Sequence, residues 1–125
     1  MRRINLLSGI FWCLIFMLSC TSTKSDSPVV HFIYPNVNTV HDLSKDLDIE
    51  IDISDDFMIK EYRFWLESGN GWEYYSEKKK LNKESYKILY KFDLSESISS
   101  DFSIHLEATD NDGNKTHEHI DVIIQ

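Results

Sequence analysis

The C-terminal stretch from Asp101 to Gln125 constrains the fold most, because polar and apolar residues alternate along it in two runs. The apolar members are Phe102, Ile104, Leu106 and Ala108 in the first run, and Ile120, Val122 and Ile124 in the second. Alternation with a period of two places one face of a strand in a core and the other in water. Between the runs, residues 110–114 read Asp-Asn-Asp-Gly-Asn, which are turn-forming residue types. The stretch therefore predicts an antiparallel β-hairpin.

The apolar faces also predict how the two strands of this hairpin pair. The expected cross-strand pairs are Leu106 with Ile120, Ile104 with Val122, and Phe102 with Ile124. A slip of one residue would set each of these apolar side chains opposite a polar one, so that slip is disfavoured. This register centres the loop on Gly113 and predicts a bulged turn such as residues 112–114. It also sets His105 opposite Asp121 and His119 opposite Glu107 on the outer face.

The chain before this hairpin also reads as strands. Apolar or alternating runs occur at residues 29–34, 47–53, 59–66, 72–75 and 86–94, and a hairpin turn is expected at Ser68-Gly69-Asn70-Gly71. We expect Asp55 and Asp56 to end one strand, and the lysine-rich residues 78–83 to form a solvated link. About seven short strands joined by turns predict an all-β fold, an antiparallel immunoglobulin-like β-sandwich.

Residues 1–19 have the features of an export signal. Two arginines precede an apolar run from Ile4 to Leu18, which is short for a membrane span of roughly 20 residues. The run stops at Ser19-Cys20 and polar residues follow it. This pattern resembles the lipobox of bacterial lipoproteins, and the resemblance implies that Cys20 becomes the lipidated N-terminus. The alternatives are an ordinary secretory peptide cleaved nearby and an uncleaved N-terminal anchor.

The sequence thus divides into a lipoprotein signal peptide (1–19), a lipidated cysteine with a flexible tether (20–27) and one immunoglobulin-like domain (28–125). The chain has two cysteines, Cys13 and Cys20, so the domain has no disulfide and no thiol chemistry. Removing residues 1–19 takes the formal charge from −8 to −10, because Arg2 and Arg3 leave with them. An acidic domain repels nucleic acid and gains nothing from anionic lipid, which argues against both as partners of the domain.

The spacing of four features carries a resemblance to a known family: Pro28, Tyr34-Pro35, residues 51–56 (Ile-Asp-Ile-Ser-Asp-Asp) and residues 108–114 (Ala-Thr-Asp-Asn-Asp-Gly-Asn). They resemble bacterial immunoglobulin-like domains, and among these the small Bacteroidetes lipoproteins with the domain of unknown function DUF4625. The resemblance covers residues 28–125. It implies the fold and a lipid-anchored place on the outer membrane, facing the periplasm or the cell exterior. That family has no assigned activity, so the resemblance implies no mechanism.

Acidic residues fall in two of the predicted loops. In an immunoglobulin-like strand order these loops lie at the same end, which would gather Asp55, Asp56, Asp110, Asn111 and Asp112. Oxygen ligands of this kind suit Ca²⁺, the one cofactor that the sequence suggests. The alternative is that these side chains stabilise their own turns, and we prefer it because the spacing lacks the final glutamate of an EF-hand.

Three histidines, His105, His117 and His119, are expected on the outer face of the last hairpin beside Glu107 and Asp121. A zinc site needs three or four ligands that converge at about 2 Å, whereas neighbours on a strand point outward in parallel. Cross-strand pairing of the histidines with the acids is the preferred interpretation. Such pairing predicts a modest rise in the histidine pKa values.

Aromatic residues form the second candidate ligand site: Trp65, Trp72, Tyr74 and Tyr75. Exposed aromatic rings can stack on sugars or anchor a protein partner. The alternative is that a second sheet or the lysine-rich link covers them.

The sequence contains no glycine-rich phosphate loop, no serine elbow and no Glu-x-x-His metal motif, so we expect no catalytic activity. The expected function is that of a lipid-anchored binding or accessory module of the cell envelope, with an envelope protein or a glycan as its partner. The sequence does not identify the ligand. The alternatives are a calcium-dependent adhesion or structural module that uses the acidic loop end, and a glycan-binding accessory lipoprotein that uses the exposed aromatic residues.

Overall fold

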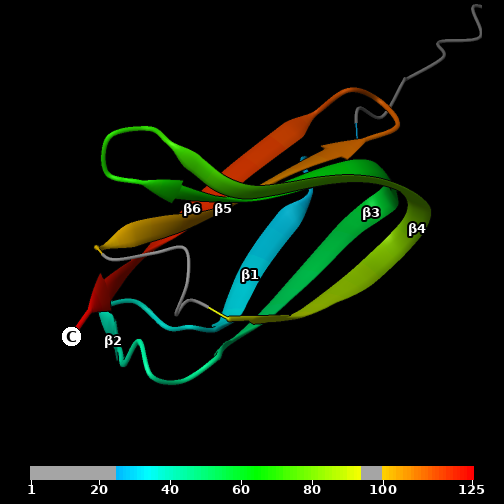
Figure 1. Cartoon of the computed structure of the whole chain (residues 1–125). Coiled ribbons are helices and arrows are strands. Elements are labelled where there is room, and N and C mark those ends of the chain that lie inside the picture. Colours follow the sequence, from blue (N-terminus) through cyan, green and yellow to red (C-terminus); the bar gives the residue numbers. More distant parts are fainter. Residues whose placement is uncertain (1–24, 94–99) are drawn as a thin grey trace, which may run out of the picture.

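A computed structural model describes residues 25–93 and 100–125 (Figure 1). Within them lie six strands: β1 (Val29–Tyr34), β2 (Thr39–His41), β3 (Leu47–Ser68), β4 (Glu73–Phe92), β5 (Phe102–Asp110) and β6 (Lys115–Ile124). They form one mixed sheet in the order β1-β3-β5-β6-β2, and β4 pairs with β3. The predicted all-β class is therefore confirmed. The expected signal peptide, Cys20, and Leu94 of the expected strand at 86–94 lie outside the described residues.

The long strands β3 and β4 run through both halves of the molecule. The first part of β3, residues 47–54, pairs with β1 and with the second part of β4. Residues 59–68 of β3 pair instead with β5 and with the first part of β4. The register shifts between Ser54 and Ile59, where β3 bends from one half into the other. The sheet is thereby curled, as Figure 1 shows, and its two arms enclose one core.

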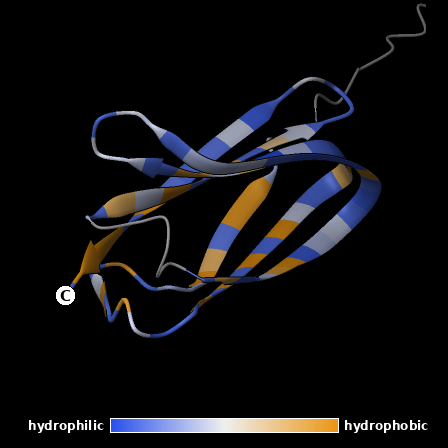
Figure 2. Cartoon of the chain, in the orientation of Figure 1, coloured by the Kyte–Doolittle hydropathy of each residue, from blue (hydrophilic) through white to orange (hydrophobic). Residues whose placement is uncertain are grey.

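The core takes one face of every long strand, and apolar and polar bands alternate along β1 and β3 in Figure 2. Its buried members are Leu47, Ile49, Ile51, Ile53, Ile59, Tyr62, Phe64 and Leu66 of β3, Ile88 of β4, Phe102, Ile104, Leu106 and Ala108 of β5, and Ile120 and Val122 of β6. The ring of Phe64 meets that of Tyr90 at 5.9 Å between centroids, across the two arms. Burying each large apolar side chain contributes about 1.5–3 kcal/mol, so this shared core holds the arms together.

The expectation of about seven separate, purely antiparallel strands is corrected in three respects. Asp55 and Asp56 do not end a strand, because β3 continues through them with an irregular register. The lysine-rich residues 78–83 lie within β4 rather than in a link. They are tolerated there because β4 pairs only with β3 in the described sheet, and lysines are common on edge strands. The short strand β2, which the sequence did not predict, pairs with β6 in parallel.

The predicted register of the last hairpin is wrong by two residues. Phe102 pairs with Val122, and Ile104 with Ile120. A two-residue shift keeps every side chain on its own face, so the alternation of residues cannot distinguish the two registers. The turn decides between them: the Asp110 amide donates to the Asn114 carbonyl at 3.0 Å, which leaves a three-residue loop at 111–113. Such loops end in a residue with positive φ.

Within residues 25–93 and 100–125, no helix is long and apolar enough to cross a membrane.

Candidate binding site

The turn between β3 and β4 holds Trp72 at one end of the sheet. The Ser68 amide donates to the Trp72 carbonyl and the Gly71 amide to the Ser68 carbonyl, each at 2.9 Å. The Trp72 amide donates to Ser68 Oγ at 3.0 Å. Gly71 adopts φ +84°, a conformation that glycine reaches without strain. The turn is thus closed on both sides of Trp72, yet the Trp72 side chain is 69% exposed and free to contact a ligand.

An open pocket of about 630 Å³ lies beside this turn. It is lined by Ser68, Gly69, Asn70, Trp72, Tyr74, Ser100, Asp101 and Ile124. Because β3 pairs Ser68 with Phe102, the start of β5 lies next to the β3–β4 turn, and the end of β6 completes the lining. The pocket therefore combines aromatic rings with amide, hydroxyl and carboxylate groups. Aromatic rings can pack against the apolar faces of a sugar while such polar groups bond to its hydroxyls.

Two of the four aromatic residues predicted as a ligand site, Trp72 and Tyr74, line this pocket. Tyr75 packs inward instead, with its ring 5.0 Å from that of Tyr90, and its hydroxyl donates to Glu77 Oε2 at 3.1 Å. The polar lining residues, Asp101 among them, were missed by the sequence reasoning. The signal for them was the hairpin turn at 68–71, but only the pairing of β3 with β5 shows what lies beside that turn.

Trp65, the remaining aromatic residue of the prediction, is 8% exposed although it lies on the outer face. Its ring stacks on His105 at 4.8 Å and on His117 at 5.2 Å between centroids. The guanidinium of Arg63 lies 4.5 Å from the indole centroid, and indole Nε1 donates to Glu67 Oε2 at 2.9 Å. Trp65 is therefore covered, as the alternative interpretation held. The cover comes from histidines rather than from a second sheet or a lysine-rich link.

His105 and His119 contact rings rather than acids, while His117 lies opposite Glu107 in the pairing of β5 with β6. His105 Nδ1 lies 3.0 Å from His117 Nε2, and the rings of His105 and His119 stack at 5.2 Å. Glu107 is paired with Lys115 at 3.0 Å. The corrected register explains this, because it sets His105 opposite His119 instead of opposite an acid. Burial lowers the pKa of His105, so the predicted rise is wrong for this residue.

The carboxylate of Asp110 is fully buried and is used by its own turn. Oδ1 accepts the Asn114 amide at 2.8 Å, while Oδ2 accepts Asn114 Nδ2 at 2.7 Å and Ser25 Oγ at 2.9 Å. Burial alone would raise the pKa of Asp110, but the hydrogen bonds from Asn114 and Ser25 outweigh it and lower the pKa. Asp110 is therefore an ionised carboxylate whose oxygens already have protein partners.

The acids of the other predicted loop accept backbone hydrogen bonds. Asp55 Oδ2 accepts the Phe57 amide at 3.1 Å, and Asp56 Oδ2 accepts the Asp26 amide at 3.3 Å. The Asn111 amide donates to the Met58 carbonyl, so the two acidic loops do meet, as predicted.

These contacts are those of turn chemistry. In the part of the chain that the structure describes, no group of three or more acidic, histidine or cysteine side chains is arranged to hold a metal ion. The calcium site stays a prediction.

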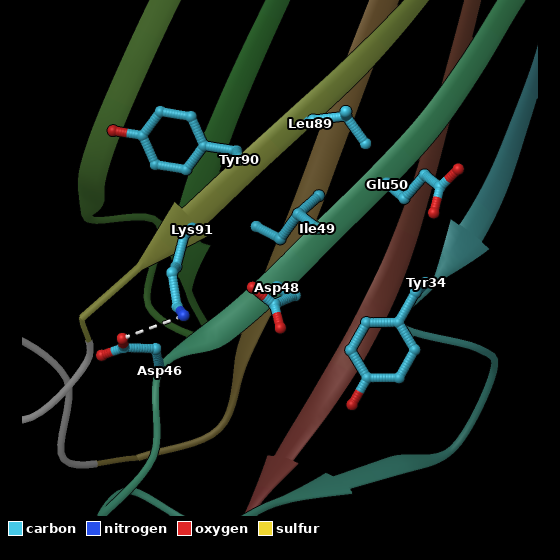
Figure 3. A pocket seen from close by; sticks show the side chains of 8 residues that line it. All are labelled: Tyr34, Asp46, Asp48, Ile49, Glu50, Leu89, Tyr90 and Lys91. Atoms are coloured by element: carbon cyan, nitrogen blue, oxygen red, sulfur yellow. Dashed lines mark ion pairs between the residues drawn. The ribbon is translucent and has the colours of Figure 1, made fainter.

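A second hollow, on the outer face of β1, β3 and β4, is drawn in Figure 3. It is lined by Tyr34, Asp46, Asp48, Ile49, Glu50, Leu89, Tyr90 and Lys91. Glu50 is paired with Lys87 at 2.5 Å, and Asp46 with Lys91 at 3.6 Å. Polar groups beside Trp72 also have partners, since Asp101 Oδ1 accepts the Ile124 amide at 2.9 Å and Asn70 Oδ1 accepts the Trp72 amide at 3.3 Å. What separates the two hollows is the aromatic ring on offer, because Trp72 is 69% exposed and Tyr34 40%. The pocket at the β3–β4 turn is therefore the candidate site.

No family model and no curated protein matches the sequence. The fold is similar to the fibronectin(III)-like modules of Clostridium thermocellum CbhA, with 19% identity and a TM-score of 0.50 over 79% of this chain and 47% of that one. It is also similar to part of OgpA from Akkermansia muciniphila, with 15% identity and a TM-score of 0.53 over 78% of this chain and 28% of that one. The chain thus spans less than half the length of either structure. At such identity the likeness shows the fold alone: an all-β domain that resembles fibronectin(III)-like modules.

Proposed function

We propose that the protein is a lipid-anchored binding module of the cell envelope and that the pocket beside Trp72 binds a glycan. One observation supports a glycan as the ligand. A tryptophan that is 69% exposed is held by a closed turn, in a pocket with Tyr74, Asn70 and Asp101. Binding sites commonly combine apolar or aromatic walls with a few placed polar groups. A sugar ring presents the complementary surface, an apolar C–H face bordered by hydroxyls.

The anchor and the location belong to the same proposal and rest on the sequence around Cys20. The charged start, the short apolar run and the Ser-Cys stop support lipidation at Cys20 and attachment to the outer membrane. The likeness to the fibronectin(III)-like modules of CbhA supports an accessory role rather than a catalytic one. An envelope protein is the alternative partner for the same aromatic surface.

The binding half of the proposal is tested by titrating the chain from Cys20 onward with a panel of soluble oligosaccharides, using calorimetry. Trp72→Ala should weaken binding of the best ligand about tenfold, since it removes a stacking term of about 0.5–1.5 kcal/mol together with the apolar area that the indole buries. Leu89→Ala is the matched control, because this residue is 70% exposed in the hollow of Figure 3. Equal affinity of wild type and Trp72→Ala would refute the pocket.

The anchor half is tested separately. In a bacterium with lipoprotein processing, Cys20→Ala should abolish incorporation of a labelled fatty acid and release the protein from the membrane fraction. Unchanged labelling of the variant would refute lipidation at this cysteine.

A further inference from the structure

The segment that precedes β1, here called the strap (residues 25–28), is fastened to the turn between β5 and β6. Ser25 Oγ lies 2.9 Å from Asp110 Oδ2 and 2.7 Å from Asp112 Oδ2. Asn114 Nδ2 donates to the Ser25 carbonyl at 3.1 Å. These three partners of Ser25 are 85 to 89 residues further along the chain. The first residue that the structure describes is thus held by both sides of this turn.

The rest of the strap is fastened as well. The Asp26 amide donates to Asp56 Oδ2, on the bend of β3, and Thr116 Oγ1 donates to the buried Pro28 carbonyl. The chain is therefore fixed over four residues before β1 begins. Ser25 stands five residues after Cys20, and five extended residues reach at most about 18 Å. A lipid on Cys20 would hold this end of the domain close to the membrane surface.

The candidate pocket lies at the other end of the sheet. β5 starts beside the pocket at Phe102 and ends at Asp110, which contacts the strap. A nine-residue strand at about 3.4 Å per residue separates the two ends by roughly 27 Å. β6 runs back over the same length, from Lys115 to Ile124 in the pocket lining. In Figure 1 the β5–β6 turn is at the right, while the β3–β4 turn and the C-terminus are at the left.

We propose that the strap orients the domain on the membrane, with the β5–β6 turn facing the lipid headgroups and the Trp72 pocket facing away from them. This inference rests on the lipid anchor of the proposed function. The pocket then meets ligands from the aqueous side of the membrane. Asp26, Asp56 and Asp112 are exposed at the membrane-facing end. Their carboxylates repel anionic headgroups, whereas Phe57 beside Asp56 is 55% exposed and can contact the membrane surface from the same end.

The strap matters because a flexible connection would not set an orientation. The root-mean-square end-to-end distance of a flexible link is about 5–6 Å times the square root of its number of residues. Such a link also leaves the attached domain free to rotate. Hydrogen bonds at Ser25, Asp26 and Pro28 remove the freedom of the last four residues of the connection. What remains between anchor and domain reaches at most about 18 Å, which is less than the roughly 27 Å between the two ends of the sheet.

The test uses the chain from Cys20 to Gln125, which retains every described residue and has Cys20 as its only thiol. Cys20 is coupled to a maleimide phospholipid in phosphatidylcholine vesicles that also carry a nitroxide headgroup lipid, which quenches nearby tryptophan. Wild type reports on the pocket end through Trp72. The double variant Trp72→Phe with Asn111→Trp reports on the strap end, and Trp65 is common to both proteins. We expect at least twofold stronger quenching in the double variant.

Ser25→Ala with Thr116→Val removes two of the fastenings and should reduce that difference in quenching. The matched control is Ser27→Ala, which removes an exposed hydroxyl of the same segment and should leave the difference unchanged. Equal quenching at the two ends, or stronger quenching of Trp72, would overturn the orientation. An unchanged difference in the strap variant would overturn the role of the strap. Because the anchor is made chemically, failure of natural lipidation or of glycan binding would leave these readouts intact.

Discussion

The indole ring of Trp65 lies parallel to the imidazole of His105, with 4.8 Å between centroids and 6° between planes. The two residues are direct cross-strand partners of β3 and β5. His119 of β6 continues the stack at 5.2 Å from His105, so flat rings form a ladder over three strands. The ladder covers Trp65 and places His105 partly out of water.

This ladder predicts that acid destabilises the domain. Burial lowers the pKa of His105 in the folded state, whereas the unfolded chain takes up the proton near the ordinary value of about 6.5. The contribution of His105 is therefore complete above that pH and is lost as the pH falls through it toward the lower folded pKa. His105→Phe keeps a flat ring and removes the titration. Urea unfolding at pH 8 and pH 5 should show a smaller loss of unfolding free energy for the variant than for wild type.

His31→Phe is the control for that comparison, because His31 is exposed on β1 and its ring is not part of the stack, although it lines a hollow together with His119. It should behave like wild type at both pH values. An equal loss of stability in wild type and His105→Phe would contradict the ladder as the source of the pH dependence.

The second prediction concerns the buried carboxylate of Asp110. Asp110→Asn keeps the size but places an amide among the donors of Asn114 and Ser25, so we expect a loss of about 1–3 kcal/mol at pH 7. The pKa of Asp110 is lowered by these bonds, which prevail over its burial. Its stabilisation is therefore full above the unfolded pKa of about 3.9 and is lost as the pH falls through the folded value.

Chemical denaturation at pH 7, 5 and 3 measures this effect. The gap between wild type and Asp110→Asn should stay constant down to pH 5 and narrow below pH 4. Asp112→Asn, at an exposed position of the same turn, should cost much less at pH 7. A gap that widens in acid would show that the carboxylate is not held in its ionised form.

The third prediction is the calcium response. Because the Asp110 oxygens already accept three hydrogen bonds, we expect the melting temperature in millimolar Ca²⁺ and in EDTA to agree within about one degree. A site at hundredfold excess over its Kd would add about 2.7 kcal/mol, which moves the midpoint of such a domain by roughly ten degrees. A shift of that size, lost in Asp56→Ala, would restore the acidic loop end as a metal site.

In the first part of β3, the alternation of residues was sufficient to predict which face is buried. Leu47, Ile49, Ile51 and Ile53 alternate, and all four are in the core. Register and strand ends were harder, since a shift of two residues preserves every face. Polar residues occur at bulges and on edge strands as well as in turns. The sequence therefore predicted connections at Asp55-Asp56 and at residues 78–83, which lie within β3 and β4.

The candidate site was predicted only in its local part. Trp72 and Tyr74 flank a turn that the sequence identifies, and both line the pocket. Asp101 joins them through the pairing of β3 with β5, a contact between residues more than thirty positions apart. The burial of Trp65 likewise depends on which β5 residue lies opposite it. Periodicity carries no information about such long-range neighbours.

The last prediction compares two glycines at opposite ends of the sheet. Gly71 and Gly113 have φ values of +84° and +86°, and a Cβ at either position would meet nothing closer than 3.9 Å. Alanine at either position therefore adds no clash and costs only the strain of a left-handed residue, about 1–2 kcal/mol. Gly71→Ala and Gly113→Ala should lower the melting temperature by similar amounts.

Only the first of the two changes should affect binding. Gly71 precedes Trp72 in the turn that holds the indole, so relaxing the strain there moves the indole in the pocket. Oligosaccharide affinity should fall for Gly71→Ala and stay at the wild-type value for Gly113→Ala, when both are measured well below their melting temperatures. If both variants lost affinity equally, the loss would follow stability rather than the position of Trp72. That outcome would contradict the role of Gly71 in placing the indole of Trp72 in the pocket.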